Sequence, residues 1–546
     1  MRRLGHSREG IAMTRRNGFA GEGPRISVAT IVRDDAEGLA ETLASIAGVA
    51  DEVVVLDTGS HDGTADVARR YGAKVFARPW DEDFAAARNA CYAHTTGDWV
   101  LWLDSGERLS RGSAAAIRSL VAGPMSAAYR VRVRVPPLSA DSQAEAIAPV
   151  RLVPRVDGLR FAGRIRESLA TSLEDAGLAV EESPVIIERG PREHDADRKL
   201  AVARRNLRLA QRDLAERGNA PDALVAKGEA CAALGRHAEA IDLLRLAIAA
   251  APRGSATQLA AYGALLAALD KLSTAAGDTL PVKIALGLEA LDVFPLDAQL
   301  LLAMGGYLQS QGQVELAARS FRVAWEHGTV TPDVWHVADA RSLAASCLSL
   351  ALSMLGRDGE ALDLLRAALP AAEDAARLRR RMLEIHIRNG RRDEALAEVE
   401  RVAAPGDVGG LRAAVRGACL AATGNWIGAI AQLEGAYRQG CRDAICRRAY
   451  LNALLATGQK SAALRIAEDW LADSPAHPEA LRFRDAASGE FRADEGTASP
   501  SSEPAVLRGP SPRIRIDTAS APQGAAILQP ALPEKSVTQT QADLAK

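Results

Sequence analysis

Four glycines recur at equal intervals in the C-terminal half of this chain. Successive members of the series are 34 residues apart, and they are Gly356, Gly390, Gly424 and Gly458. Each is followed five residues later by an alanine, at Ala361, Ala395, Ala429 and Ala463. An irregular bundle would not produce three equal intervals, whereas a repeated unit of helix, glycine-containing turn and helix would. Glycine accepts the backbone of the turn, and the small alanine permits close approach of the two helices.

The same frame continues toward the N-terminus. It fits Gly235 and Gly312, and residues 255–295 hold a degenerate copy with insertions. A period of 34 residues with this anchoring resembles the tetratricopeptide repeat. We therefore predict an all-α solenoid of about seven repeats over residues 195–486. Such solenoids offer an extended concave surface that recruits a protein or glycan partner.

The ends of the chain and its composition limit the class of protein. Residues 1–24 lack the apolar core of a signal peptide, and residues 487–546 are rich in proline, serine, alanine and glutamine, so we predict that both are disordered. No stretch approaches the roughly 20 apolar residues of a transmembrane segment. The 67 basic and 69 acidic residues argue against binding to nucleic acid through bulk charge. Six scattered cysteines suit a reducing compartment, and we expect a cytoplasmic protein.

Residues 25–190 alternate between short apolar runs and amphipathic segments, which is typical of an α/β domain. The runs at residues 26–32 and 52–57 have the continuous apolar character of strands that are buried on both faces. Close alternation of strand and helix predicts a largely parallel sheet. Asp57 and Asp104 follow two of the strands, so they should meet at the edge where open α/β sheets bind ligands.

A strictly alternating segment, YRVRVRV, occupies residues 129–135. Alternation of this kind predicts one antiparallel strand with a wet face. The wet face would carry Arg130, Arg132 and Arg134. We expect these arginines to be solvated, with a phosphate or an acidic partner as the alternative.

Four stretches of this region, taken in order, resemble family 2 glycosyltransferases of the GT-A fold, especially the bacterial subgroup in which this domain precedes tetratricopeptide repeats. They are ISVATIVRDD, VADEVVVLDTGSHDGT, YGAKVFARPWDEDFAAARNAC and TTGDWVLWLDSGERL. The resemblance implies a GT-A-like sheet of Rossmann type and a hexosyl-type transfer from a nucleotide-sugar donor.

The resemblance also implies roles for individual residues in donor binding. Asp57 matches the acid that accepts a hydrogen bond from the nucleotide base, and its position at the end of a strand favours this role over the alternative, which is capping of the Asp-Thr-Gly-Ser turn. Asp83, Arg88 and Asn89 match the segment that lines the donor pocket, and an internal ion pair between Arg88 and Asp83 is the alternative. Asp104 matches the first aspartate of the Asp-x-Asp motif, which contacts the ribose and the metal shell.

This sequence departs from the family pattern at two places. Gly106 stands where a second aspartate would bind Mg²⁺ or Mn²⁺, so the predicted metal ligands are Asp104 and Glu107. The downstream segment ends in Arg166-Glu167, where relatives carry His-Glu. Glu167 is the candidate catalytic base that takes the acceptor proton, and Arg166 either offsets diphosphate charge or pairs with its neighbour.

Three functional hypotheses follow. The first is an active glycosyltransferase whose repeats recruit a protein, peptide or glycan acceptor. The second is a catalytically inactive scaffold that acts through protein binding by its repeats. The third is a nucleotidyltransferase or dinucleotide enzyme, and the absence of a Gly-x-Gly-x-x-Gly motif after the first strand argues against it.

Overall fold

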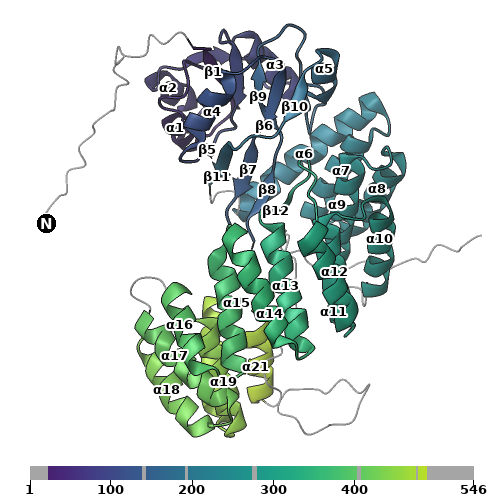
Figure 1. Cartoon of the computed structure of the whole chain (residues 1–546). Helices are drawn as coiled ribbons and strands as arrows, with labels where there is room; N and C mark the ends of the chain where they lie inside the picture. The colour runs from purple at the N-terminus through teal and green to yellow at the C-terminus, as the bar shows by residue number, and fades with distance from the viewer. Residues whose placement is uncertain are drawn as a thin grey trace, which may run out of the picture.

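The computed structural model describes residues 23–137, 143–190, 195–272, 279–402, 408–474 and 477–488. An α/β region occupies the N-terminal part of the chain, and helices follow it to the last described residue (Figure 1). The predicted fold class, an α/β region followed by an all-α solenoid, is therefore confirmed. The segments that we predicted to be disordered lie almost wholly outside the described residues, although Ala487 and Ser488 belong to the last helix.

A seven-stranded sheet forms the centre of the α/β region. Its order is β10-β6-β9-β4-β1-β2-β3, and β1, β2, β3 and β4 run parallel. β9 runs antiparallel to both β4 and β6. The strands are β1 (Ile26–Val32), β2 (Glu52–Asp57), β3 (Lys74–Ala77), β4 (Trp99–Trp102), β6 (Ala127–Arg130), β9 (Val150–Pro154) and β10 (Ala179–Glu181).

Helices cover both faces of this sheet. One apolar cluster joins β1 to α1 and α4 through residues such as Val28, Leu43 and Ile117. A second cluster joins the other face to α3, with Cys91 and Trp102 as members. This burial explains the continuous apolar runs of β1 and β2. The helices are α1 (Ala36–Ser45), α2 (Thr64–Arg70), α3 (Phe84–Ala93), α4 (Ser113–Val121) and α5 (Ala170–Asp175).

The alternating segment at residues 129–135 does not form the single strand that the pattern predicted. The chain leaves the first sheet after Arg130 and enters a second, five-stranded sheet at Arg132. The prediction was wrong because alternation shows which side chains share a face and not which sheet the backbone joins. The second sheet has the order β12-β8-β7-β11-β5 and consists of β5 (Glu107–Leu109), β7 (Arg132–Val135), β8 (Glu145–Ile147), β11 (Ile186–Arg189) and β12 (His336–Val337).

The arginines of that segment are only partly exposed and pair with acids, so the expectation that they are simply solvated is wrong. Arg130 donates to Asp333 at 2.6 Å, and Arg132 donates to Glu373 at 2.5 Å. Both acids belong to the helical region. β12 also comes from that region, yet it pairs antiparallel with β8. The helical region therefore completes a sheet of the α/β region.

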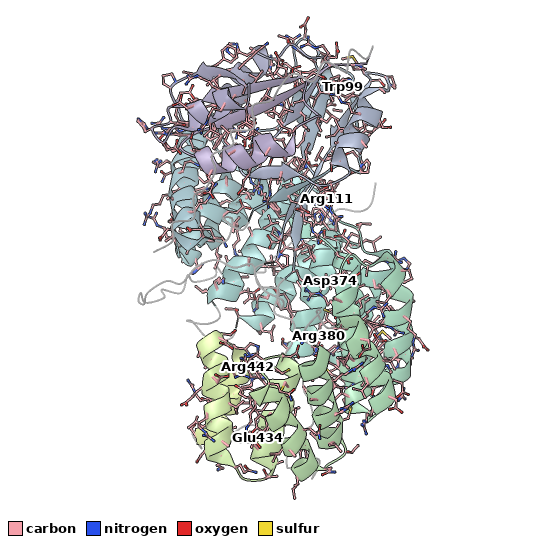
Figure 2. The ribbon with its side chains drawn as sticks, turned by 90° about the vertical axis from the view of Figure 1, so that its left-hand side faces the viewer. Trp99, Arg111, Asp374, Arg380, Glu434 and Arg442 are labelled. Atoms are coloured by element: carbon pink, nitrogen blue, oxygen red, sulfur yellow. The ribbon has the colours of Figure 1, made fainter. Side chains whose placement is uncertain are left out.

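The helical region confirms the repeat prediction. The four glycines of the 34-residue series each lie in the turn between two helices, with φ from +65° to +80°. The four alanines that follow them have no exposed surface. Figure 2 shows the described side chains as sticks, with Trp99 labelled in the α/β region and Arg442 labelled toward the C-terminal end of the helical array.

The helices run from residue 196 to residue 488. Within the described ranges, none combines the length and apolar character of a membrane span. They are α6 (Ala196–Arg217), α7 (Pro221–Ala233), α8 (His237–Ala250), α9 (Ala256–Leu272), α10 (Leu280–Val293), α11 (Ala298–Ser310), α12 (Val314–His327), α13 (Ala340–Met354), α14 (Asp358–Ala368), α15 (Ala375–Arg388), α16 (Arg392–Val402), α17 (Val408–Ala422), α18 (Trp426–Arg438), α19 (Ala444–Ala456), α20 (Lys460–Asp473) and α21 (Pro478–Ser488).

Enlarging a repeat alanine should destabilise the solenoid. Ala429 in α18 is fully buried, so Ala429→Leu would overpack the helix contact and lower the free energy of unfolding by about 1–3 kcal/mol. Ile427 in the same helix is 82% exposed, and Ile427→Leu should change it by less than about 0.5 kcal/mol. Urea unfolding followed by circular dichroism measures both. Equal effects of the two changes would contradict the repeat packing.

Candidate active site at the sheet edge

Asp57 and Asp104 lie at the same edge of the parallel sheet, as predicted. β1 separates the strands that they follow, so their backbones are roughly 10 Å apart. Their side chains nevertheless have different partners. Asp57 accepts hydrogen bonds from the amides of Gly59 at 3.0 Å and Ser60 at 2.8 Å, which is the turn-capping arrangement. Asp57 is therefore held by its own loop.

Asp104 belongs instead to a cluster of three carboxylates and three guanidinium groups. We call it the acid–arginine cluster. Arg88 donates to Asp104 Oδ1 at 2.9 Å, and Arg151 donates to Asp104 Oδ2 at 2.9 Å. Its members are Asp104, Glu107, Glu167, Arg88, Arg151 and Arg189.

Glu107 is the most deeply buried carboxylate of the cluster, with a side chain that is 2% exposed. Its Oε2 accepts from the backbone amide of Asp104 at 2.8 Å. Its Oε1 accepts from Arg151 at 3.3 Å and from Arg189 at 3.2 Å. Gly106 forms the turn between the two acids with φ of +89°, a conformation that suits glycine. Glu107 thus packs inward beneath the turn.

This arrangement does not fit the predicted metal site. All four carboxylate oxygens of Asp104 and Glu107 accept hydrogen bonds from the protein, and a divalent cation needs several oxygens that are free to coordinate. The guanidinium groups also balance the negative charge that would attract a cation. No group of three potential metal-ligating side chains occurs in the part of the chain that the structure describes. We therefore derive no catalytic step through a metal.

Arg88 connects Asp104 to Glu167. Its Nε donates to Glu167 Oε1 at 2.7 Å, and its guanidinium lies 5.3 Å from the ring centre of Trp102. The alternative pairing of Arg88 with Asp83 is not formed. Asp83 instead caps α3 by accepting from the amide of Ala86 at 2.8 Å.

Asn89 binds the backbone of Phe161 with both ends of its amide. Its Nδ2 donates to the Phe161 carbonyl at 2.9 Å, and its Oδ1 accepts from the Phe161 amide at 2.8 Å. Asn89 therefore fixes the neighbouring loop, and Phe161 in turn lies 5.5 Å from the Arg88 guanidinium. Among the predicted donor-binding residues, the structure brings Arg88 and Asp104 together. Asp57 and Asp83 instead cap their own segments, and Asn89 binds the distant backbone of Phe161.

Glu167 differs from the other two acids of the cluster. Its Oε1 is bonded to Arg88, while its Oε2 has no hydrogen-bond partner among the described residues. The side chain is 16% exposed. The preceding residue, Arg166, pairs with Glu229 of α7 at 2.9 Å and not with its neighbour. The second of the two roles considered for Arg166 is therefore wrong.

Sequence reasoning missed Arg151 and Arg189. Both arginines bond to Glu107, from which they are separated by 44 and 82 residues of sequence. Arg189 also lies 5.4 Å from the ring of Trp335, which the helical region supplies. The one signal in the sequence that could have indicated these two arginines is their place in strands, since Arg151 is the second residue of β9 and Arg189 is the last residue of β11.

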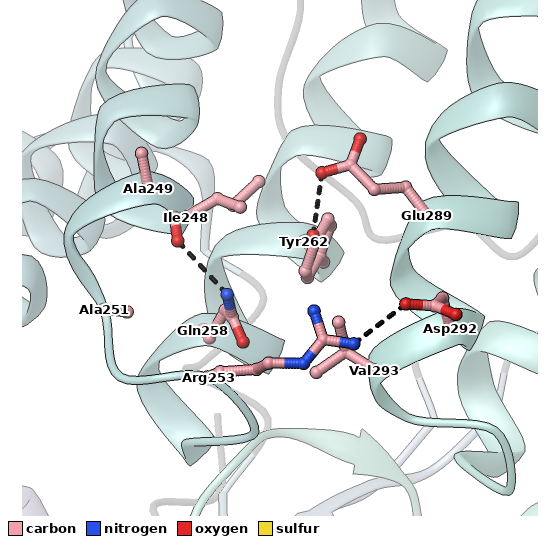
Figure 3. Close-up of a pocket in the computed structure, with 9 residues that line it drawn as sticks. All are labelled: Ile248, Ala249, Ala251, Arg253, Gln258, Tyr262, Glu289, Asp292 and Val293. Carbon is pink, nitrogen blue, oxygen red and sulfur yellow. Dashed lines mark hydrogen bonds and ion pairs between the residues drawn. The ribbon is translucent and has the colours of Figure 1, made fainter. Parts of the chain in front are cut away.

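A separate hollow of about 530 Å³ lies within the solenoid between α8, α9 and α10 (Figure 3). Its polar lining is already paired. Arg253 donates to Asp292 at 2.8 Å, and the Tyr262 hydroxyl donates to Glu289 at 2.9 Å. Its residues do not overlap with the acid–arginine cluster, and we place the candidate site at the sheet edge.

Comparison with known proteins finds sequence similarity within the α/β region. Residues 27–112 match the family described as Glycosyl transferase family 2. A TPR repeat-containing protein of Synechococcus elongatus is 44% identical over 107 residues, which are 20% of this chain and 27% of that protein. An uncharacterized glycosyltransferase of Rickettsia felis is 32% identical over 87 residues, which are 16% of this chain and 30% of that protein. The chain therefore matches less than a third of the length of these two relatives.

A solved tetratricopeptide repeat protein from Parabacteroides merdae is among the structures similar to this chain. It is 14% identical, with a TM-score of 0.37, and the similarity covers 49% of this chain and 98% of that one.

Asp104→Asn should destabilise the protein more at pH 7 than at pH 3. Burial raises the pKa of Asp104, but Arg151 and Arg88 outweigh burial and hold it well below its ordinary value. A carboxyl with a lowered folded pKa stabilises the fold above its unfolded pKa of about 3.9, and this stabilisation is lost as the pH falls through the folded pKa. We expect Asp104→Asn to lower the free energy of unfolding by up to about 3 kcal/mol at pH 7.

Urea unfolding of both forms at the two pH values measures this difference. Asp66→Asn is the control, because Asp66 is exposed and pairs with Arg69 on the surface of α2. It should change stability by less than about 1 kcal/mol at either pH. An Asp104→Asn effect that is the same at pH 7 and pH 3 would show that the cluster does not lower the pKa of Asp104.

Proposed function

We propose that this chain, in which a family 2 glycosyltransferase domain is joined to tetratricopeptide repeats, transfers a hexosyl-type sugar from a nucleoside-diphosphate donor to a protein, peptide or glycan acceptor. The match over residues 27–112 supports the donor class, since it includes Arg88 and Asp104. The repeats support recruitment of an acceptor, because solenoids bind partners along their surface.

One observation carries the catalytic part of the proposal: within the acid–arginine cluster, Glu167 binds Arg88 through Oε1, while its Oε2 has no hydrogen-bond partner among the described residues. A transferase needs a carboxylate that removes the acceptor proton while the diphosphate departs. Arg88 holds Glu167 in place through one oxygen and leaves the other for the acceptor hydroxyl. Guanidinium groups at the same edge are suited to stabilise the negative charge of the departing diphosphate.

The inactive scaffold remains a second candidate, and a specific observation favours it. Asp104 and Glu107 both bind arginines of the same chain, so they are not free to bind a donor through a metal. A scaffold would keep this cluster for stability alone. The two candidates differ in whether the chain binds a sugar nucleotide.

Differential scanning fluorimetry separates the two candidates. We expect one sugar nucleotide from a panel of UDP and GDP sugars to raise the midpoint of thermal unfolding, because a ligand at about 100 times its Kd stabilises the folded state by roughly 2.7 kcal/mol. The rise should occur without Mn²⁺, since arginines bond to Asp104 and Glu107, the two carboxylates that were predicted to hold the metal. Indifference to the whole panel would support the scaffold, and a rise only with Mn²⁺ would show that a cation displaces the arginines.

Glu167→Gln tests the catalytic base. The amide cannot take a proton, so the release of nucleoside diphosphate from the stabilising donor, with water as acceptor, should fall about 10²- to 10⁴-fold. The thermal shift with the donor should persist. Glu174→Gln is the matched control, because Glu174 is an exposed residue of the nearby α5. Unchanged release in Glu167→Gln would remove Glu167 from the mechanism.

A further inference from the structure

The first helix of the solenoid packs against the candidate site. Leu209 and Ala210 of α6 form a buried cluster with Ile165, which lies two residues before Glu167. Trp80 and Phe84 pack against the same cluster. Two ion pairs hold this contact from the side, since Arg164 donates to Glu216 of α6 at 2.8 Å and Arg166 donates to Glu229 of α7 at 2.9 Å. The solenoid therefore forms one wall of the site.

Arg205 lies on α6 one turn before Leu209, and so on the same side of the helix. Its guanidinium carbon lies 5.0 Å from the centre of the Phe84 ring. Phe84 begins α3, and Arg88 follows it by one turn of that helix. The stacking contact thus places Arg205 beside the row of α3 residues that leads into the acid–arginine cluster.

Among the described residues, Arg205 differs from the other arginines at this contact in having no acid within ion-pair distance. Arg212 pairs with Glu82 at 2.9 Å, and Arg208 lies 3.7 Å from the same carboxylate. Arg205 is partly buried, yet within the described ranges its hydrogen bonds go to the amide oxygen of Asn206, at 3.1 and 3.3 Å.

The charges around Arg205 are consistent with its place beside the acid–arginine cluster. Burial lowers the pKa of Arg205, and the neighbouring charges of Arg198 and Arg208 lower it further. Glu167 and Asp104 act in the opposite direction, so both are near enough to influence the guanidinium. The three acids of the cluster are balanced by Arg88, Arg151 and Arg189. Arg205 therefore adds a fourth guanidinium beside a cluster that has three acids.

We propose that Arg205, supplied by the solenoid, binds the diphosphate group of the nucleotide donor, so that both parts of the chain build the donor site. A guanidinium offers a planar set of donors that matches phosphate oxygens. Stacking on Phe84 orients these donors before the ligand arrives. The assignment rests on the proposed function, because it takes a nucleoside diphosphate as the ligand.

Isothermal titration of the full chain with UDP and GDP tests the assignment. Arg205→Gln should weaken binding of the preferred diphosphate about 10- to 100-fold, as expected for loss of a charge-assisted hydrogen bond. Arg204→Gln is the matched control on the same helix, because Arg204 is exposed, and it should leave affinity unchanged. Arg205→Lys keeps the charge and should recover part of the loss.

The corresponding nucleoside, which lacks phosphate, should bind the wild-type, Arg205→Gln and Arg204→Gln chains with equal affinity. Equal diphosphate affinity of Arg205→Gln and Arg204→Gln would overturn the role of Arg205 while leaving the proposed function intact. Equal losses for the nucleoside and the diphosphate would also overturn it, since they would indicate a general disturbance of the pocket. A wild-type chain that binds neither diphosphate would remove the proposed function and this role together.

Discussion

The guanidinium of Arg88 joins the sheet edge to the loop that carries the candidate base. It bonds to Asp104 after β4 and to Glu167 in the loop before α5, with the rings of Trp102 and Phe161 against it. Buried charges are costly to desolvate, and such a group is tolerated only when its partners are in place. The geometry of the site therefore depends on three charged groups that cannot move independently.

The solenoid packs directly against the α/β region and contributes residues to it. It supplies β12 to the second sheet, Trp335 beside Arg189, and the acids that pair with Arg130 and Arg132. These contacts extend from the rim of the sheet to the middle of the helical array. If the repeats recruit an acceptor as proposed, these contacts join its binding surface to the region that carries Glu167.

The sequence predicted those features that depend on local pattern. The bounds of β1 and β2 match their apolar runs, and the glycine series located the turns of four repeats. The capping of its own loop by Asp57 was foreseen only as the alternative to base binding. Such features require only neighbouring residues and the period of a helix or strand.

The features that escaped prediction depend on contacts between distant residues. Arg88 and Glu167 are 79 residues apart, and Arg130 reaches an acid 203 residues away. The alternation at residues 129–135 could not show that the backbone changes sheets at Val131. The pairing of Asp104 and Glu107 with arginines likewise depends on the tertiary fold. Arg151 and Arg189 each contact both acids, and both arginines are distant from them in sequence.

A double-mutant cycle between Arg88 and Glu167 tests the central claim most directly. The free energies of unfolding of the wild type, Arg88→Gln, Glu167→Gln and the double variant give the coupling between the two side chains. A buried bridge that organises the site should yield a coupling of at least about 1.5 kcal/mol. A coupling near zero would show that the two groups are independent, and the account of a preorganised site would then be wrong.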